Sequence, residues 1–256
     1  MAGKPELLPP MLTVMTYNVG AGLAAPLRLV EVLRQSGADI IGLQELAPEQ
    51  GAAIADLLGS DYPYHVLHAT GIPGKGLLSR FPVRETQLLE LHPGRPDLQA
   101  RVAAPDGEIA VIVAHPPPPR LGRNRIRQAA LADQQISGIA VEATRGQPSV
   151  LLTDFNRVGW QAAYHQLRQS GLIDAFGTAG RGAGFTLPTR FSHLAYRGHP
   201  LGELPLPPLL RVDYVWHTAH FRTLASWIGG NAGSDHLPVL AELVRVDGPQ
   251  GHGVMG

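Results

Sequence analysis

The chain has 256 residues, enough for one large domain, and 44% of them are apolar, enough to fill a substantial core. Lys and Arg total 21, as do Asp and Glu, so the zero net charge argues against a general surface for polyanions. The absence of Cys excludes disulfides and thiolate metal sites. No run reaches the roughly 18 apolar residues of a membrane span, and residues 1–10 lack the apolar stretch of a signal peptide, so we expect a cytoplasmic protein.

The first half of the chain predicts strands and helices in alternation, followed by a run of strands. Residues 12–17 alternate apolar and polar side chains and end at Asn18. Pro26 is typical of a first helical residue, and Gly37 of a helix end. In chain order we expect a strand at 12–17, a helix from Pro26 to Gly37, a strand at 39–43, a helix at 48–58, and strands near 64–68, 75–79, 83–91, 99–104 and 108–114.

The second half begins with four prolines at 116–119, which must be extended and cannot pair as a central strand. A long helix is expected at about 122–144, with a buried stripe at helical spacing formed by Ile126, Ala129, Ala132, Ile136, Ile139 and Ala143. We then expect a strand at 149–153, a helix near 159–170, a Gly- and Pro-rich loop over 177–210, and strands at 211–217, 219–227 and 237–246.

Strand and helix patterns mix along the whole chain, without an internal repeat or a linker that divides the composition. We therefore predict one α/β domain over residues 1–256, with a core at 12–246 and flexible tails at 1–10 and 247–256. The runs of consecutive strands favour antiparallel pairing. A layered sandwich is therefore expected rather than a doubly wound parallel sheet.

Polar side chains stand where apolar strands start or stop. Hydrophobic strands hold such residues rigidly, so their tips can converge in one cleft at the edge of a sandwich. These candidate site residues are Asn18, Glu45, His115, Asp154, Asn156, Asp213, Asp235 and His236.

This residue set suits a hard divalent cation, Mg²⁺ or as the alternative Mn²⁺, and suits Zn²⁺ less well, because it is rich in oxygen ligands and has no Cys. Mg²⁺ usually takes one or two protein carboxylates and fills its shell with water and phosphate. Glu45, helped by Asn18 and Asp235, could supply these ligands. The remaining residues would be free to handle a phosphoryl group and a water, as the hydrolysis of a phosphate ester requires.

Several of these residues also have a structural explanation. An Asn18, Asp154 or Asn156 that follows a strand is typical of a turn or a helix cap. His115 is compatible with a core histidine whose hydrogen bonds are satisfied. Asp213 lies inside an apolar strand pattern, where an unpaired carboxylate is costly, so the sequence favours a function there. The joint pattern favours a site.

The chain carries seven short motifs, which lie between about residues 12 and 243: Thr-Tyr-Asn18, Asp39-Ile-Ile-Gly-Leu-Gln-Glu45, Gly76-Leu-Leu-Ser-Arg-Phe-Pro82, the strand end at His115, Asp154-Phe-Asn156, Arg211-Val-Asp213-Tyr and Ser234-Asp235-His236. In this order they resemble the endonuclease/exonuclease/phosphatase superfamily. That superfamily includes pancreatic-type deoxyribonucleases, abasic-site endonucleases, neutral sphingomyelinases and inositol-polyphosphate 5-phosphatases. The motifs are specific for the superfamily and much less specific for the substrate.

The resemblance implies a four-layered α/β-sandwich of the α/β (α+β) class, with two packed, mainly antiparallel sheets flanked by helices and a cleft at one edge. It also implies a Mg²⁺-dependent hydrolase of phosphate esters. Glu45 would be the main metal ligand, assisted by Asn18 and Asp235.

The resemblance implies catalytic roles for the other candidates. His236, oriented by Asp213, would be the general base or an acid/base partner of a metal-activated in-line water. Asp154 and Asn156 would position that water and a phosphate oxygen. His115 would donate a hydrogen bond to the phosphoryl group.

The sequence departs from the superfamily pattern at three places. Thr153 replaces the Gly that usually precedes Asp-Phe-Asn, and four prolines follow His115 where a Leu is usual. Abasic-site enzymes have a Lys soon after the metal-binding Glu, where this chain has Leu46 and Ala47, and a Tyr in place of His115. The last departure argues against a role in DNA repair.

Two segments bear on the substrate. Arg120, Arg123, Arg125 and Arg127 either guide an anionic substrate or form a solvated helix start. The apolar loop at 201–210 either touches a lipid or packs over the edge of the core.

Three functions are weighed. The first is a phosphodiesterase or phosphatase acting on a small or lipid-linked phosphate ester. The second is a metal-dependent DNA endo- or exonuclease, which the zero net charge and the lack of Lys-rich segments disfavour. The third is a non-catalytic binding module, whose signature would be the loss of Glu45, Asp154 or His236, and none of them is lost.

Overall fold

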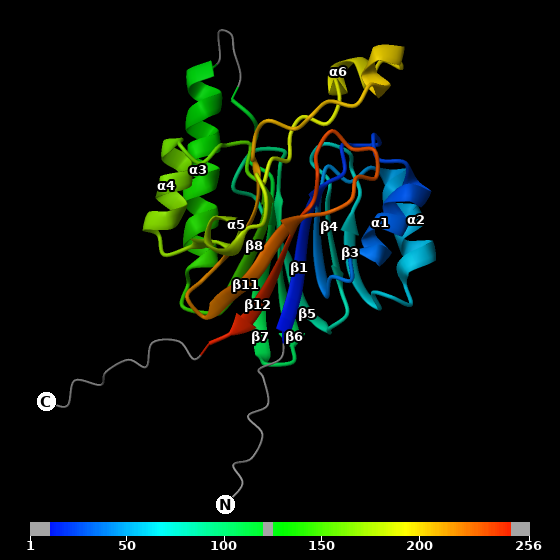
Figure 1. The fold of residues 1–256 in the computed structure, drawn as a ribbon. Helices are drawn as coiled ribbons and strands as arrows, with labels where there is room; N and C mark the ends of the chain where they lie inside the picture. Colours follow the sequence, from blue (N-terminus) through cyan, green and yellow to red (C-terminus); the bar gives the residue numbers. More distant parts are fainter. Residues whose placement is uncertain (1–10, 120–124, 247–256) are drawn as a thin grey trace, which may run out of the picture.

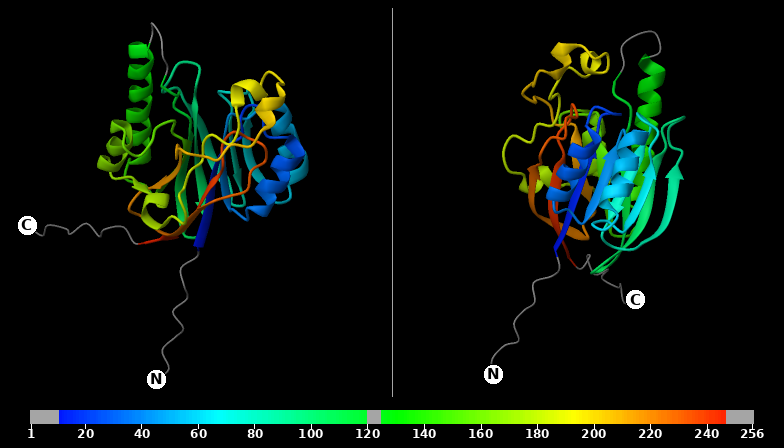
Figure 2. Two further views of the ribbon diagram at one scale, coloured as in Figure 1. Left: turned by 45° about the horizontal axis from the view of Figure 1, so that its top comes forward. Right: turned by 90° about the vertical axis from the view of Figure 1, so that its right-hand side faces the viewer.

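The structure is a computed structural model that describes residues 11–119 and 125–246. Two six-stranded mixed sheets pack against each other, and helices cover the outer face of each (Figures 1 and 2). This arrangement confirms the four-layered α/β-sandwich. The predictions for residues 1–10 and 247–256, and those for Arg120 and Arg123, lie outside the described residues.

The first sheet, called sheet A here, has the strand order β11-β12-β1-β2-β4-β3. Its one parallel pair is β1 with β2, and the other pairs are antiparallel. The helices α1 and α2 pack on its outer face through a shared apolar cluster. The bounds are β1 Met11–Asn18, α1 Pro26–Gln35, β2 Ile40–Gln44, α2 Pro48–Leu58, β3 Tyr64–His68, β4 Lys75–Ser79, β11 Phe221–Ile228 and β12 Val239–Arg245.

The second sheet, sheet B, has the order β5-β6-β7-β8-β10-β9, with β7 and β8 as its parallel pair. The helices α3 and α4 pack on its outer face. The bounds are β5 Val83–Leu89, β6 Asp97–Ala104, β7 Gly107–Ala114, α3 Arg125–Ala143, β8 Ser149–Asp154, α4 Ala162–Gln169, β9 Ile173–Asp174 and β10 Asp213–His217. Three short helices complete the described chain: α5 Ala175–Ala179, α6 Ser192–Ala195 and the 3-10 helix η1 Pro200–Glu203.

The alternation of side chains along the strands builds the layers. In β1, Val14 points into the core between the sheets, whereas Met15 points toward the helices on sheet A. At Gly42 in β2 a Cβ atom would lie only 2.8 Å from Cβ of Leu152 in β8, so the glycine lets the two sheets approach closely. This close packing brings the strand ends of both sheets to one edge.

The predicted elements agree closely with the structure, apart from the start of α3, the unpredicted β9 and α5, and the segment at 177–210. The buried stripe of α3 begins at Ala132, because the first turns of the helix extend beyond the sheet (Figure 1) and leave Ile126 78% exposed and Ala129 exposed. The prediction that these two side chains are buried is therefore wrong. The segment predicted as loop over 177–210 contains α6 and η1. Among the described helices, none is both long and apolar enough to cross a membrane.

Candidate functional site

Polar residues from both sheets meet at the edge of the sandwich that is uppermost in Figure 1. The parallel pairing of β1 with β2 sets Asn18 opposite Gln44. The antiparallel pairing of β8 with β10 sets Asp154 opposite Asp213. The structure gathers at this edge all the predicted site residues, which are Asn18, Glu45, His115, Asp154, Asn156, Asp213, Asp235 and His236.

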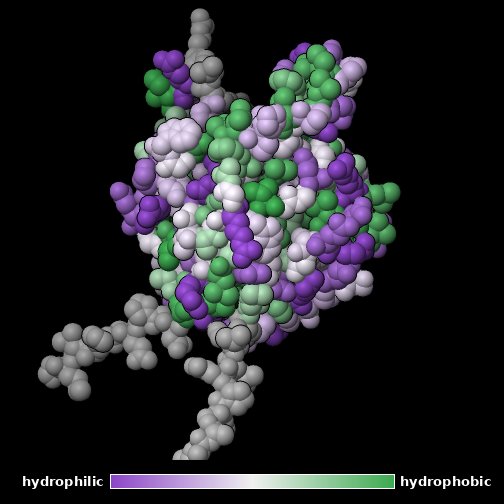
Figure 3. Space-filling model, viewed as in Figure 1, coloured by the Kyte–Doolittle hydropathy of each residue, from purple (hydrophilic) through white to green (hydrophobic). Residues whose placement is uncertain are grey.

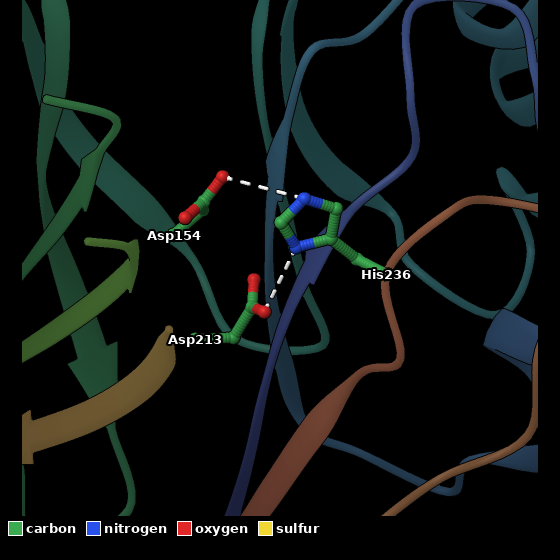
Figure 4. A group of neighbouring side chains, drawn as sticks. All are labelled: Asp154, Asp213 and His236. Atoms are coloured by element: carbon green, nitrogen blue, oxygen red, sulfur yellow. Dashed lines mark hydrogen bonds and ion pairs between the residues drawn. The ribbon is translucent and has the colours of Figure 1, made fainter. Parts of the chain in front are cut away.

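The centre of the site is a buried histidine between two aspartates (Figure 4). Nδ1 of His236 lies 2.9 Å from Oδ2 of Asp213, and Nε2 lies 3.8 Å from Oδ2 of Asp154. Their side chains are at most 7% exposed. Because a carboxylate accepts, Nδ1 carries the proton of the bond to Asp213, and this leaves Nε2 directed toward Asp154.

The charges of this group shift the pKa values of its members. Burial alone would lower the pKa of His236, but the carboxylates of Asp213 and Asp154 raise it well above its usual value. Burial penalises the Asp154 carboxylate, yet His236 and His115 hold its pKa well below the usual range. Burial raises the pKa of Asp213, against the opposing effect of His236. The group therefore favours a protonated imidazole between carboxylates when nothing else is bound.

Asp154 also accepts hydrogen bonds from both sides of the site, one of which joins the two sheets. The side-chain amide of Asn18 donates to its Oδ2 at 2.8 Å, and the backbone N–H of Asn156 donates to its Oδ1 at 2.9 Å. Asn156 adopts a left-handed φ of 50°, and its side-chain amide donates to the carbonyl of Pro116 at 3.1 Å. The carboxylate of Asp154 is thus held by residues on both sides.

His115 connects the buried group to Glu45. Its Nε2 lies 3.4 Å from Oδ2 of Asp154 and 3.6 Å from Oε1 of Glu45. Its backbone N–H donates to Oδ1 of Asp97 at 3.0 Å, and Asp97 also accepts from the side-chain amide of Gln135 at 2.8 Å. These bonds fix the backbone of His115, and Nε2 of its imidazole faces the site.

Glu45 and Asp235 form the more open part of the site. The Glu45 side chain is 17% exposed, and its backbone has a left-handed φ of 53°, which is uncommon for a residue with a Cβ. Burial raises the pKa of Glu45; the nearby His115 lowers it, and the carboxylates of Asp154 and Asp235 raise it. Asp235 is half-buried and receives one long hydrogen bond, 3.5 Å from Oγ of Ser234.

Two sets of side chains at this edge could hold a cation. Among the described residues, Asp154, Asp213 and His236 have ligand atoms that all lie within 4.8 Å of one another. In that set, however, Asp213 and Nδ1 of His236 already pair with each other.

The other set is Glu45, Asn18 and Asp235, which offers oxygen atoms only, as Mg²⁺ prefers. Burial raises the pKa of Glu45, and the carboxylates of Asp154 and Asp235 add to this effect; a bound cation would favour the charged form of Glu45. The donor set therefore fits a divalent metal.

Sequence reasoning missed three residues at this edge. Asp97 supports His115 from the next strand, and Lys75, only 1% exposed, is a close charge partner of Asp97. Tyr196 donates its hydroxyl to the carbonyl of Gly20 at 3.0 Å, next to Glu45. The sequence indicates Asp97 only weakly, as a carboxylate beside an apolar strand. It does not indicate Tyr196, which lies in a segment without periodicity.

The two segments singled out for the substrate are at the surface. Arg125 and Arg127 are exposed on the first turn of α3. In the loop at 201–210 Leu206 is half-buried, but the other four leucines are exposed and do not pack over the core edge: Leu201 50%, Leu204 50%, Leu209 65% and Leu210 38%. That structural explanation of the loop is wrong for these side chains.

Several solved structures share the fold. An endonuclease/exonuclease/phosphatase from Beutenbergia cavernae DSM 12333 has a TM-score of 0.71 and 22% identity, over 92% of this chain and 72% of that chain. An endonuclease/exonuclease/phosphatase from Bacteroides vulgatus has a TM-score of 0.68 and 18% identity, over 93% and 100%. D. rerio TDP2 complexed with a single strand DNA product has a TM-score of 0.69 and 14% identity, over 91% and 98%. At these identities the likeness concerns the fold.

The sequence itself matches a family model. No curated protein matches the chain. The model of the Endonuclease/Exonuclease/phosphatase family, however, matches residues 15–236, a range that includes every candidate site residue from Asn18 to His236. The chain therefore belongs to the endonuclease/exonuclease/phosphatase family, whose membership indicates a hydrolase of the phosphoesterase or nuclease type.

Proposed function

We propose that the chain is a Mg²⁺-dependent hydrolase of phosphate esters, a phosphodiesterase or phosphatase, that uses an in-line water and a His236–Asp213 base. One observation carries the proposal: His236 is bonded through Nδ1 to Asp213 at 2.9 Å, and its Nε2 is directed toward Asp154. This is the arrangement that a general base needs, with one nitrogen fixed and the other facing the site, where the neutral form of the imidazole can take a proton.

Glu45, Asn18 and Asp235 would hold the metal, which when bound would supply charge neutralisation for the phosphate group. Mn²⁺ has similar ligand preferences and is the alternative ion. The half-open position of Glu45 and Asp235 supports this assignment, because a phosphate substrate must reach the cation.

The buried residues would handle the water and the phosphoryl group. Nε2 of His236 would take the proton of the attacking water, while Asp213 fixes the tautomer and stabilises the imidazolium that forms. Asp154, facing Nε2, and Asn156 would orient that water and a phosphate oxygen. His115, whose Nε2 faces Asp154 and Glu45, would donate a hydrogen bond to a phosphoryl oxygen and stabilise the charge of the transition state.

A DNA nuclease is the second candidate. TDP2 from D. rerio, which shares the fold, is complexed with a single strand DNA product. The net charge of zero argues against extended contacts with a DNA backbone. A small or lipid-linked phosphate ester is therefore favoured as the substrate.

A substrate panel tests the proposal. Bis-aryl phosphate, mono-aryl phosphate, a phospholipid and plasmid DNA are each incubated with Mg²⁺ and with EDTA. We expect hydrolysis of at least one of the first three with Mg²⁺ and none with EDTA. Cleavage of plasmid DNA alone would favour the nuclease. No hydrolysis of any substrate with Mg²⁺ or Mn²⁺ would contradict the proposed function.

A further inference from the structure

A segment that crosses the site edge brings an aromatic side chain beside Glu45. The segment at 190–210, called the arm here, contains α6 and η1 and projects from that edge (Figures 1 and 2). From the C-cap of α6, the hydroxyl of Tyr196 donates to the carbonyl of Gly20 at 3.0 Å, although the two residues are 176 positions apart. The residue after Gly20, Ala21, donates its backbone N–H to the carbonyl of Glu45 at 2.8 Å, so the phenol is fixed on the loop that lies against Glu45.

The base of the arm is fixed to the same site. Thr189, which precedes the arm, donates its hydroxyl to the carbonyl of Ser234 at 2.6 Å and its backbone N–H to the carbonyl of Asp235 at 2.8 Å. Within the arm, Gly202 packs so tightly under α6 that a Cβ atom there would lie 2.2 Å from the backbone N of Ala195. The arm is therefore a well-packed element that is bonded to the site at two points, through Thr189 and through Tyr196.

The anchored hydroxyl leaves the ring of Tyr196 as the exposed part of the side chain. Tyr196 is 51% exposed, and its neighbours on the arm, Phe191, Leu201 and Leu204, are 42%, 50% and 50% exposed. Figure 3 shows hydrophobic groups beside hydrophilic ones on the lobe that contains α6. A ring that is fixed at its polar end and belongs to a half-exposed residue can pack against a ligand without losing rotamer freedom on binding.

We propose that Tyr196 is a specificity-determining residue whose ring packs against an apolar substituent of the phosphate ester held at Glu45. The inference rests on the proposed function and adds the chemical class of the substituent: an aromatic or aliphatic group next to the phosphate. A strongly polar substituent would meet the apolar surface of the arm and lose hydrogen bonds to water. An apolar one removes its own surface and that of the ring from water.

Binding of phosphonates tests the inference without turnover, because their C–P bond resists simple hydrolysis. Phenylphosphonate and methylphosphonate carry the same anionic group and differ in the apolar substituent. Isothermal titration calorimetry in the presence of Mg²⁺ gives both affinities for the wild type, Tyr196→Ala, Tyr196→Phe and Tyr64→Ala. Tyr64 is a matched control, because it is 39% exposed on the edge strand β3 and bonds to none of the described site residues.

We expect the wild type and Tyr64→Ala to bind phenylphosphonate about tenfold more tightly than methylphosphonate. Tyr196→Ala should reduce that preference to less than about twofold and leave the affinity for methylphosphonate unchanged. Tyr196→Phe keeps the ring and should keep most of the preference. A third ligand, n-hexylphosphonate, separates the two kinds of substituent: tighter binding than phenylphosphonate assigns a lipid-like chain, and weaker binding assigns an aromatic group.

Three results would overturn the inference: no preference in the wild type, no measurable binding of either phosphonate, or an equal loss of both affinities in Tyr196→Ala. The last would mean that Tyr196 only supports Glu45 and the loop at Gly20. Failure of the proposed function looks different, because it is an absence of hydrolysis across the substrate panel. A wild type that hydrolyses esters but does not distinguish the phosphonates therefore contradicts only the role of Tyr196.

Discussion

The two halves of the site differ in how their charges are paired. In the buried half, formed by His115, Asp154, Asp213 and His236, the carboxylates accept hydrogen bonds of 2.8–2.9 Å, and the side chains are at most 7% exposed. In the open half, formed by Glu45 and Asp235, the carboxylates have longer contacts, at 3.6 Å from Glu45 to His115 and 3.5 Å from Asp235 to Ser234.

This difference suggests a division of labour. In the buried half, the bond to Asp213 orients the imidazole of His236 before a substrate arrives. In the open half, by contrast, two carboxylates repel each other, and a cation would complete the arrangement. Substitutions in the buried half should therefore impair hydrolysis, whereas substitutions in the open half should impair cation binding.

The largest effect is expected for His236→Ala, which removes the proposed base. We expect a loss of at least about 10³-fold in kcat/KM with the fold intact, because the proton of the water would have no acceptor of comparable strength. Ester hydrolysis and circular dichroism measure the two quantities. His65→Ala, at an exposed histidine on β3, is the matched control. A rate within about tenfold of the wild type would remove His236 from the mechanism.

Asp213→Asn should have the next largest effect, a loss of about 10²–10⁴-fold in kcat, because an amide no longer selects the tautomer of His236. The sign of the pH effect follows from the charges. The Asp213 carboxylate raises the pKa of His236, so its removal lowers that pKa. A base acts when neutral, and the acidic limb of the pH–rate profile should therefore move to lower pH. An unchanged profile would show that Asp213 does not act on the base.

The sequence predicted the elements well wherever local signals decide them. The bounds of α2, β3 and β4 agree with the predicted ranges, because apolar periodicity and Gly or Pro boundaries are local. All the predicted site residues lie at one edge, since each stands at the end of an apolar strand and within a family motif. Their roles in catalysis and metal binding stay predictions.

The features that the sequence did not predict depend on tertiary contacts. Helical spacing at Ile126 does not say where the neighbouring sheet ends, and the residue lies beyond it. Asp97 supports His115 only through the pairing of β6 with β7. Tyr196 meets Gly20 across 176 positions, from a segment that has no periodicity to read.

A smaller effect on hydrolysis is expected for His217→Gln. His217 is a useful comparison with His236, because it is a buried histidine outside the site. It lies at the far end of β10 from Asp213, and its ring nitrogens lie 2.9 Å from the carbonyl of Thr218 and 2.7 Å from the hydroxyl of Thr223. Burial lowers the pKa of His217, whereas the carboxylates around His236 raise that of His236. In the folded protein His236 should therefore take up a proton at a higher pH than an ordinary histidine, and His217 at a lower pH.

The pKa of His217 is depressed in the folded state, so the unfolded chain takes up the proton first and this contribution to stability is lost as pH falls through about 6.5. His217→Gln should be less stable than the wild type near neutral pH but lose less stability between about pH 7 and about pH 5.5. Urea unfolding at the two pH values measures this, and ester hydrolysis should stay within about twofold. If His217→Gln lost as much stability as the wild type over this pH range, or more, the lowered pKa of His217 would be contradicted.

The most direct test of the division between the two halves is Mn²⁺ binding, followed by electron paramagnetic resonance, in the wild type, Glu45→Gln and His236→Ala, with Glu31→Gln on α1 as the control. Glu31 is an exposed carboxylate that bonds only with Gln35 in the described structure. We expect Glu45→Gln to weaken Mn²⁺ binding by at least about tenfold, and His236→Ala to bind Mn²⁺ like the wild type while hydrolysing no ester. Loss of Mn²⁺ binding in His236→Ala with binding retained in Glu45→Gln would place the cation among Asp154, Asp213 and His236 and contradict the account.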